Sequence, residues 1–266
     1  MESNQAIIKN AIEFLLFEYF GLTLEDGNDQ ATIVHKAVEL AYDDATNQGA
    51  FNALFNDKEI KNGTRKMASV VEKSVKELYE SGIAFDDWHK NLCEEICNKY
   101  GKICDNNAYP LANSFFSYGN AQKWVNMTIK NLYVISGAYL AVGCKDNKSF
   151  FESVASRSDE YHVPLDNIIL GELYKQELLG SRKDGPIRKS GRKEPSYYIS
   201  GEENGTEQKY TWSRIPSQDF YEAFRKKLED AIHKKEEKPI EWECEDWIER
   251  KKRIKELGKD LSKIDD

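Results

Sequence analysis

One lysine and one aspartate stand where their side chains could do chemistry together. Lys123 lies one turn inside a segment that otherwise has the pattern of a largely apolar helix, and a lysine shielded from water gives up its proton more readily and becomes a nucleophile. Asp166 follows Pro164 at the start of another predicted helix. A carboxylate at such a helix start can also face a developing positive charge.

Each of these residues also has a purely structural explanation. The aliphatic stem of Lys123 can lead its ammonium to the surface, or the ammonium can pair with an acidic side chain. Asp166 occupies the N-cap position, where a carboxylate accepts backbone amide hydrogen bonds and lies at the positive end of the helix dipole. Spacing alone leaves both explanations open for both residues.

The composition limits the class of protein. Apolar residues make up 40% of the 266 residues and charged residues 32%, which is typical of a globular protein with many solvated helix faces. The net charge of -8 argues against a generally basic nucleic-acid binder, although a local basic face remains compatible with it. Five cysteines give no disulfide framework. With no apolar run that could cross a bilayer and no signal peptide, we expect a cytoplasmic protein without membrane contact.

The spacing of apolar residues predicts a mainly α fold. The first four predicted helices span 5–20, 29–48, 64–81 and about 86–100, the last with Gly101 as its C-cap. A short helix over 111–118, a tight turn at Gly119 and a long helix from Asn120 to about Val142 follow.

The composition changes between 181 and 209, where basic residues and glycines gather from Arg182 to Lys193. This basic loop could contact phosphates or be a mobile, solvated segment. Residues 196–199 and 210–212 could pair as a small β-hairpin around Gly201–Gly205. Helices are expected again over 217–266.

Two short segments resemble a known family. Gln-Lys-Trp-Val-Asn-Met-Thr-Ile-Lys-Asn-Leu at 122–132, followed by Val-Pro-Leu-Asp at 163–166, resembles the helix-hairpin-helix DNA glycosylases, in particular the 8-oxoguanine DNA glycosylases of archaeal and bacterial type. In that family a lysine opens the second helix of the hairpin, and an aspartate begins a later helix after a proline. The hairpin of this chain keeps only Gly119 of the glycine-rich family sequence.

The resemblance implies a single two-lobed helical domain over 1–266, with the hairpin and catalytic helices at about 111–180. Lys123 would be the catalytic nucleophile and Asp166 its electrostatic partner. The resemblance also implies residues at the DNA surface, with the hairpin amides on a phosphate: Ser117, Tyr118, Gly119, Asn120, Gln122 and His162. The partner would be double-stranded DNA whose modified base, such as 8-oxoguanine, is flipped out and excised in base excision repair. Lysine attack at the sugar could lead on to strand cleavage, and no cofactor is expected.

Other patterns in the sequence point to different chemistry. The side chains of His89, Cys93 and Cys97 recur on one helix face, with Cys104 following, as zinc ligands could. The same residues fit a buried core stripe, and we expect no metal. Arg157 and His162 have the spacing of HEPN-type ribonucleases, although Pro164 disfavours a helix around His162. A non-catalytic interaction protein, as in phage–host conflict and phage defence, remains a further alternative.

Overall fold

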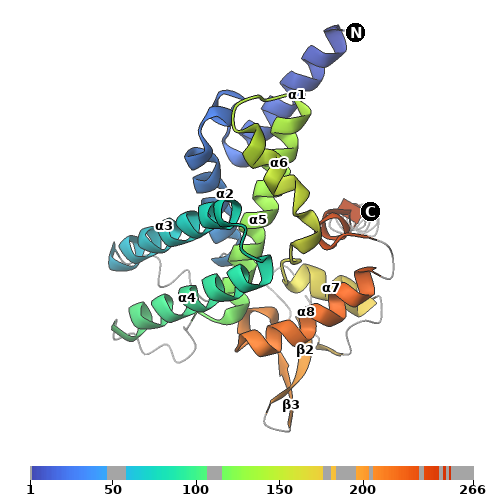
Figure 1. Cartoon of the computed structure of the whole chain (residues 1–266). Helices are drawn as coiled ribbons and strands as arrows, with labels where there is room; N and C mark the ends of the chain where they lie inside the picture. The colour runs from blue at the N-terminus through green and yellow to red at the C-terminus, as the bar shows by residue number, and fades with distance from the viewer. Residues whose placement is uncertain are drawn as a thin grey trace, which may run out of the picture.

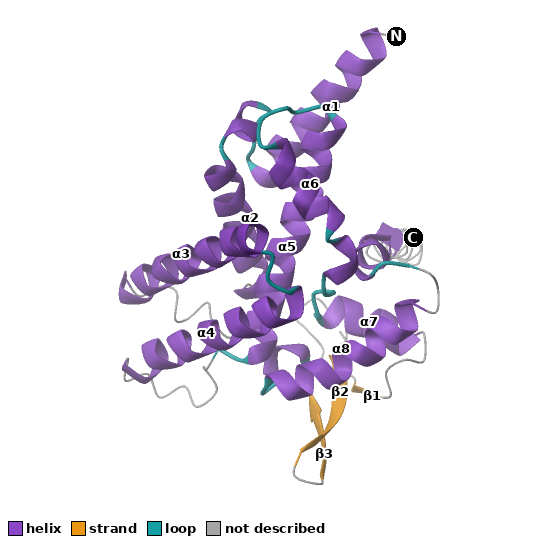
Figure 2. Ribbon diagram, viewed as in Figure 1, coloured by secondary structure: helices purple, strands orange, loops and turns teal. Residues whose placement is uncertain are grey.

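The computed structural model describes residues 2–46, 58–106, 116–175, 181–183, 196–203, 206–233, 237–245, 248–249 and 252. The fold is mainly helical with a small antiparallel sheet, which confirms the predicted fold class (Figure 2). Figure 1 shows α5 in the centre of the molecule, with the other helices arranged around it.

The N-terminal helices lie at one end of the molecule. Helix α1 (Glu2–Phe20) leads through a short 3-10 turn, η1 (Glu25–Asn28), into α2 (Gln30–Thr46). Asp29 begins α2 because its Oδ1 accepts from the amides of Ala31 and Thr32 at 2.9 and 3.3 Å. The apolar side of α2 packs along α5, and the outer half of α1 projects away from the rest of the molecule (Figure 1).

Helices α3 (Lys58–Ser81) and α4 (Phe85–Asn106) form a hairpin that extends to one side (Figure 1). The indole Nε1 of Trp88 in α4 donates to the carbonyl of Ser74 in α3 at 2.8 Å. The prediction that Gly101 ends the fourth helix was wrong, because α4 continues through it to Asn106. A single glycine weakens a helix by about 1 kcal/mol, which flanking residues can offset.

Helix α5 (Tyr118–Ala141) begins at Ser117, whose hydroxyl accepts from the Asn120 amide while the Asn120 side chain accepts from the Ser117 amide. This reciprocal capping box fixes the first turn of the helix. The predicted tight turn at Gly119 was therefore wrong, since Gly119 lies in that first turn. The predicted helix over 111–118 lies largely outside the described residues, so the hairpin element stays a prediction.

The chain after α5 reverses twice. Helix α6 (Lys148–Ser156), which sequence spacing did not predict, packs against α5 and is followed by the 3-10 turn η3 (Ser158–Glu160). The extended residues 161–166 then lead into α7 (Asn167–Lys175), whose start after Pro164 agrees with the predicted cap at Asp166.

The small sheet has the order β1-β2-β3. Strand β2 (Ser196–Glu203) pairs antiparallel with β1 (Ser181–Lys183) and with β3 (Thr206–Tyr210), with Ile199 opposite Tyr210. A hairpin is thus present as predicted, but its second strand spans 206–210 and not 210–212, and a third strand comes from the start of the basic section. A 3-10 turn, η4 (Trp212–Arg214), connects the sheet to α8 (Gln218–His233), and residues 239–245 are again helical.

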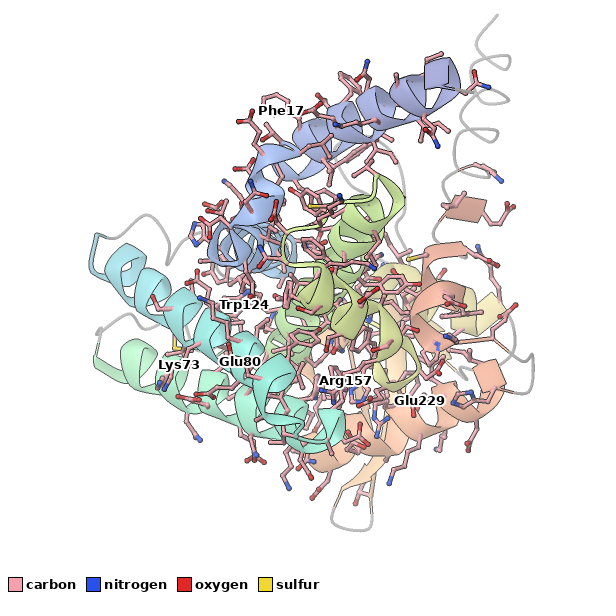
Figure 3. All side chains as sticks on the ribbon, turned by 45° about the horizontal axis from the view of Figure 1, so that its top comes forward. Phe17, Lys73, Glu80, Trp124, Arg157 and Glu229 are labelled. Carbon is pink, nitrogen blue, oxygen red and sulfur yellow. The ribbon has the colours of Figure 1, made fainter. Side chains whose placement is uncertain are left out.

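The buried apolar residues form one continuous core around α5. Its members come from the helices on every side of α5 and from the sheet, among them Val38, Leu78, Ile129, Tyr161 and Tyr221. Trp124 of α5 lies in the middle of this core, as Figure 3 shows. A single core agrees with one domain, and the division into two lobes stays a prediction.

Candidate active site

The first turns of α5 place Lys123 inside the protein. Trp124, its neighbour, donates through its indole Nε1 to the carbonyl of Val38 at 3.0 Å and so fixes α5 against α2. Lys123 then points toward the last turn of α2. Its Nζ lies 3.0 Å from Asp44 Oδ2 and donates to the Asp44 carbonyl at 3.3 Å. The side chain of Lys123 is 1% exposed.

Asp166 approaches the same ammonium from the start of α7. Its Oδ1 accepts from the amides of Ile168 and Ile169 at 2.7 and 2.9 Å, which makes Asp166 the cap of this helix. Its other oxygen, Oδ2, lies 3.6 Å from Lys123 Nζ. The carboxylate of Asp166 therefore caps α7 with one oxygen and faces the ammonium of Lys123 with the other.

An aromatic ring completes the surroundings of the ammonium. Lys123 Nζ lies 4.9 Å from the centre of the Trp212 ring, in the range of a cation–π contact. Two hydrogen bonds between α5 and the residues that follow Trp212 hold this ring in place. Ser117 Oγ donates to the Ser213 carbonyl at 2.8 Å, and the Gly119 amide donates to the Ile215 carbonyl at 3.3 Å.

A glutamine sets the distance between Lys123 and Asp166. Gln122 donates to the Leu165 carbonyl at 2.9 Å and accepts from the Leu165 amide at 3.2 Å, so it pairs with this backbone as a neighbouring strand would. Its Oε1 also accepts from Asn126 at 3.1 Å. Because Gln122 precedes Lys123 and Leu165 precedes Asp166, this pairing places the two candidate catalytic residues opposite each other.

The predicted DNA contacts are not on the surface. Ser117, Tyr118, Gly119, Asn120 and Gln122 are all buried. The amides that were expected to hold a phosphate bond within the protein instead: that of Gly119 to Ile215, and those of Asn120 and Ala121 to Ser117. The segment 211–215 lies against Ser117 and Gly119, whereas Gln122 pairs with Leu165 and the ring of Tyr118 packs against that of Tyr221.

His162 is also buried, and its partners are side chains. Its Nε2 lies 2.7 Å from Asp86 Oδ1, and its Nδ1 lies 3.2 Å from the hydroxyl of Tyr221. Pairing with a carboxylate places the proton on Nε2, so Nδ1 accepts from Tyr221. The prediction that His162 contacts DNA is not met in this conformation.

The geometry of a HEPN-type ribonuclease is not formed. Helix α6 ends at Ser156, so Arg157 and His162 do not share a helix. The guanidinium of Arg157 instead donates to the carbonyls of Leu78 and Ile83 at 3.1 and 2.8 Å and pairs with Glu160 at 2.7 Å. Arg157 thus joins α6 to the α3–α4 connection.

Two of the candidate zinc ligands, His89 and Cys93, are buried in the core. The Sγ of Cys93 lies 3.7 Å from His89 Nε2. Burial raises the pKa of the Cys93 thiol and lowers the pKa of His89, so a neutral thiol and a neutral imidazole are favoured. Within the described side chains, which do not include that of Cys104, no three such groups converge as metal ligands would.

Sequence reasoning missed two residues that touch the ammonium, Asp44 and Trp212. Asp44 is one of several acidic residues near a helix end, and Trp212 is a buried aromatic residue, 4% exposed. Neither residue has a local pattern that points to Lys123. Each lies far from Lys123 in the sequence and comes next to it only because the segments pack together in the fold.

Comparison of the chain with protein-family profiles, curated proteins and solved structures found no match. Within the described ranges, none of the helices has both the length and the apolar character that a membrane span requires. What can be inferred about function therefore comes from the site itself.

Proposed function

We propose that the protein is a base-excising enzyme of the DNA glycosylase type, with Lys123 as nucleophile and Asp166 as its electrostatic partner. The observation that carries this proposal is the 3.6 Å between Lys123 Nζ and Asp166 Oδ2, two groups from separate helices that the resemblance pairs as catalytic residues. A primary amine beside a carboxylate has the groups that Schiff-base formation at a sugar carbon requires.

The proposed reaction begins when Lys123 loses a proton to Asp44, which lies 3.0 Å away and is 51% exposed, so that the proton can pass on to water. The neutral amine attacks the anomeric carbon of a flipped nucleotide. As the new carbon–nitrogen bond forms, the glycosidic bond breaks and the base leaves with its electron pair and takes up a proton from water. The nitrogen then loses a proton, the bond between the anomeric carbon and the ring oxygen breaks, and the ring oxygen takes up a proton, which leaves the carbon–nitrogen double bond of a protonated Schiff base. Asp166 stabilises the positive charge that develops on the sugar.

Substrate binding requires the site to open. At 1% exposure the amine of Lys123 cannot touch a substrate, and the ring of Trp212 lies over it. The opening in this proposal is at the 211–215 segment, since its displacement would remove the Trp212 ring from Lys123 and free the Gly119 amide. Flipping a base out of the duplex costs a few kcal/mol, which contacts made in the open state must offset.

The test is borohydride trapping on duplexes that each carry one modified base, 8-oxoguanine among them. Borohydride reduces a Schiff base to a stable covalent link, so the wild-type chain should become attached to at least one duplex. Lys123→Ala should abolish the attachment. A matched control is Lys130→Ala, because Lys130 also lies on α5 and is also paired with a carboxylate, that of Glu243 at 2.6 Å.

The two variants separate loss of chemistry from loss of fold. If Lys130→Ala traps as the wild type does and Lys123→Ala, with an equally cooperative unfolding transition, does not, the nucleophile is Lys123. Trapping that survives Lys123→Ala would remove this lysine from the mechanism. The absence of trapping on every duplex would contradict the enzymatic proposal.

A second candidate function is that of a non-catalytic interaction protein, in which Lys123 only joins three segments. One observation favours it: the large apolar side chains of α1 that remain exposed, such as Ile7 and Phe14 at 62% and 64%. An exposed apolar patch of this kind marks a contact surface. The trapping experiment distinguishes the two candidates, because this one predicts no covalent attachment.

A further inference from the structure

Helix α1 exposes apolar side chains along most of its length. Figure 1 shows its N-terminal half projecting beyond the other helices, and Figure 3 places Phe17 on its outer side. On the inner side Leu16 is 2% exposed and packs into the core. The large apolar side chains of the rest of the helix are 49% to 68% exposed: Ile7, Ile8, Phe14, Leu15, Phe17 and Tyr19. A cluster of exposed large apolar side chains on one helix marks a contact surface.

The outer side of α1 has a repeat of seven. Asn4, Ala11 and Glu18 recur every seventh residue, and all three are exposed. Ile7 and Phe14 form a second line with the same spacing, and Ile8 and Leu15 form a third. Residues seven apart lie on one side of a helix, so the three lines together form a single exposed stripe, or seam.

We propose that this seam binds a second copy of the chain, with the two α1 helices antiparallel and Ala11 at the twofold axis. Residues equally distant from Ala11 on either side then face each other, so Asn4 meets Glu18 of the other copy. In the same way Ile7 meets Leu15, and Ile8 meets Phe14. The contact is isologous and closed, which gives a dimer rather than a filament.

Charge selects the antiparallel orientation. In a parallel pair the two Glu18 carboxylates would face each other, and like charges across a seam are destabilising. In the antiparallel pair each Glu18 faces the amide of Asn4, which can donate a hydrogen bond to it. The methyl group of Ala11 at the axis lets the two backbones approach closely.

The charges of α1 also favour a protein partner over a lipid surface. A helix that lies in a membrane interface is typically rich in lysine and arginine on its polar side. Between Glu2 and Phe20 the only basic residue is Lys9, against three glutamates at positions 2, 13 and 18. The charges of the seam thus match those of the same seam on a second copy and do not match an anionic membrane.

The first test is the mass of the full chain in solution, measured by sedimentation over a wide concentration range. We expect the wild type to dimerise, and Ala11→Glu to weaken the dimer at least about tenfold by placing two carboxylates at the axis. The matched control is Val134→Glu, since Val134 is an exposed apolar residue of α5, 40% exposed. A wild type that is monomeric throughout, or a dimer that Ala11→Glu leaves intact, would overturn the proposal.

The second test concerns orientation and the kind of partner. Asn4→Lys places a lysine opposite Glu18 of the other copy in the antiparallel dimer, so the dimer should become roughly threefold tighter. In a parallel dimer the same change sets lysine against lysine, and a weaker dimer would overturn the proposed arrangement. Co-sedimentation with vesicles of phosphatidylcholine and phosphatidylglycerol should leave the protein in solution, and binding of the wild type to them through α1 would overturn it too.

Discussion

At Lys123 the ammonium is in contact with groups from three separate parts of the chain. Asp44 closes one side from α2, Asp166 lies opposite at the start of α7, and Trp212 covers the end. Asp44 is half exposed, and an ion pair that water reaches contributes little to stability. Asp166 is 18% exposed, so its interaction with the amine is less screened by water.

Asp166→Asn separates the two functions of this residue. The asparagine oxygen can still accept from the amides of Ile168 and Ile169, so α7 should keep its cap and the free energy of unfolding should fall by less than about 1 kcal/mol. The negative charge opposite Lys123 is lost, and borohydride trapping should fall by about a hundredfold or more. Urea unfolding and trapping on the same preparation check both parts. Trapping at the wild-type rate would show that Asp166 is only a cap.

The buried histidines make stability dependent on pH. Burial lowers the pKa of His89 and of His162 below the ordinary 6.5, although the bond to Asp86 opposes the shift for His162. The native protein therefore keeps both rings neutral where the unfolded chain already takes up protons. Stability should be complete above pH 6.5 and should fall below it, by at most about 1.4 kcal/mol per pH unit for each ring.

Asp86 makes the stability of the protein depend on pH in a more acidic range. Its hydrogen bond from His162 lowers its pKa from 3.8 to about 2, so this contribution is present above pH 3.8 and is lost as the pH falls toward 2. Urea unfolding at several pH values between 7.5 and 5 isolates the histidines. His89→Gln should reduce the slope in that interval, and a wild type equally stable at both ends would contradict the prediction.

Residue types alone predicted part of the site. Lys123 was singled out because it lies one turn inside a largely apolar helix, Asp166 because it begins a helix after a proline, and the resemblance paired them; the structure brings them within ion-pair distance. Asp44 and Trp212 could not be selected in this way. The first is one of many acidic residues on a helix and the second one of several tryptophans, and only tertiary packing brings them to the lysine.

Among the elements, the start of α5 and the segment 211–215 make the closest contact. A Cβ added to Gly119 would lie 1.8 Å from the Trp212 carbonyl oxygen, a backbone atom that cannot turn aside. This approach explains why a glycine stands there, and it corrects the interpretation of Gly119 as a turn. From the sequence alone, a glycine can indicate either a turn or a close approach of another segment to the backbone, and the two cannot be told apart.

Gly119→Ala should therefore lower the free energy of unfolding by about 3 kcal/mol or more, because the added methyl group pushes two backbones apart. Gly137→Ala is the matched control on the same helix, since a Cβ there meets nothing within 4 Å. It should stabilise the protein by about 0.5 to 1 kcal/mol through helix propensity. Urea unfolding of the two variants checks the difference, and equal effects would mean that the Trp212 segment is not held against α5.

Elements with a strong local pattern were predicted well. The apolar spacing of α2, α3 and α8 and the hairpin of β2 and β3 all appeared close to their expected positions. Helix α6 was missed because its nine residues carry too few turns for a period to stand out. Its burial against α5 stabilises it more than its sequence alone would.

For the whole molecule, the sequence predicted the class of fold and left the arrangement open. The mainly helical character follows from local spacing, whereas the central place of α5 follows from contacts between distant segments. The exposed seam of α1 depends both on local spacing and on the packing of the whole molecule. Its repeat of seven is visible in the sequence, but that the core leaves it uncovered is known only from the structure.

The contact between the start of α5 and the segment 211–215 also has a consequence for synthesis of the protein. Ser117 and Ser213, which bond to each other, are 96 residues apart along the chain. At ordinary rates of translation the ribosome needs roughly 5 to 20 seconds to make that length. During this time the tyrosine, glycine and lysine at the beginning of α5 remain uncovered. A nascent chain stalled in this interval would present them to chaperones.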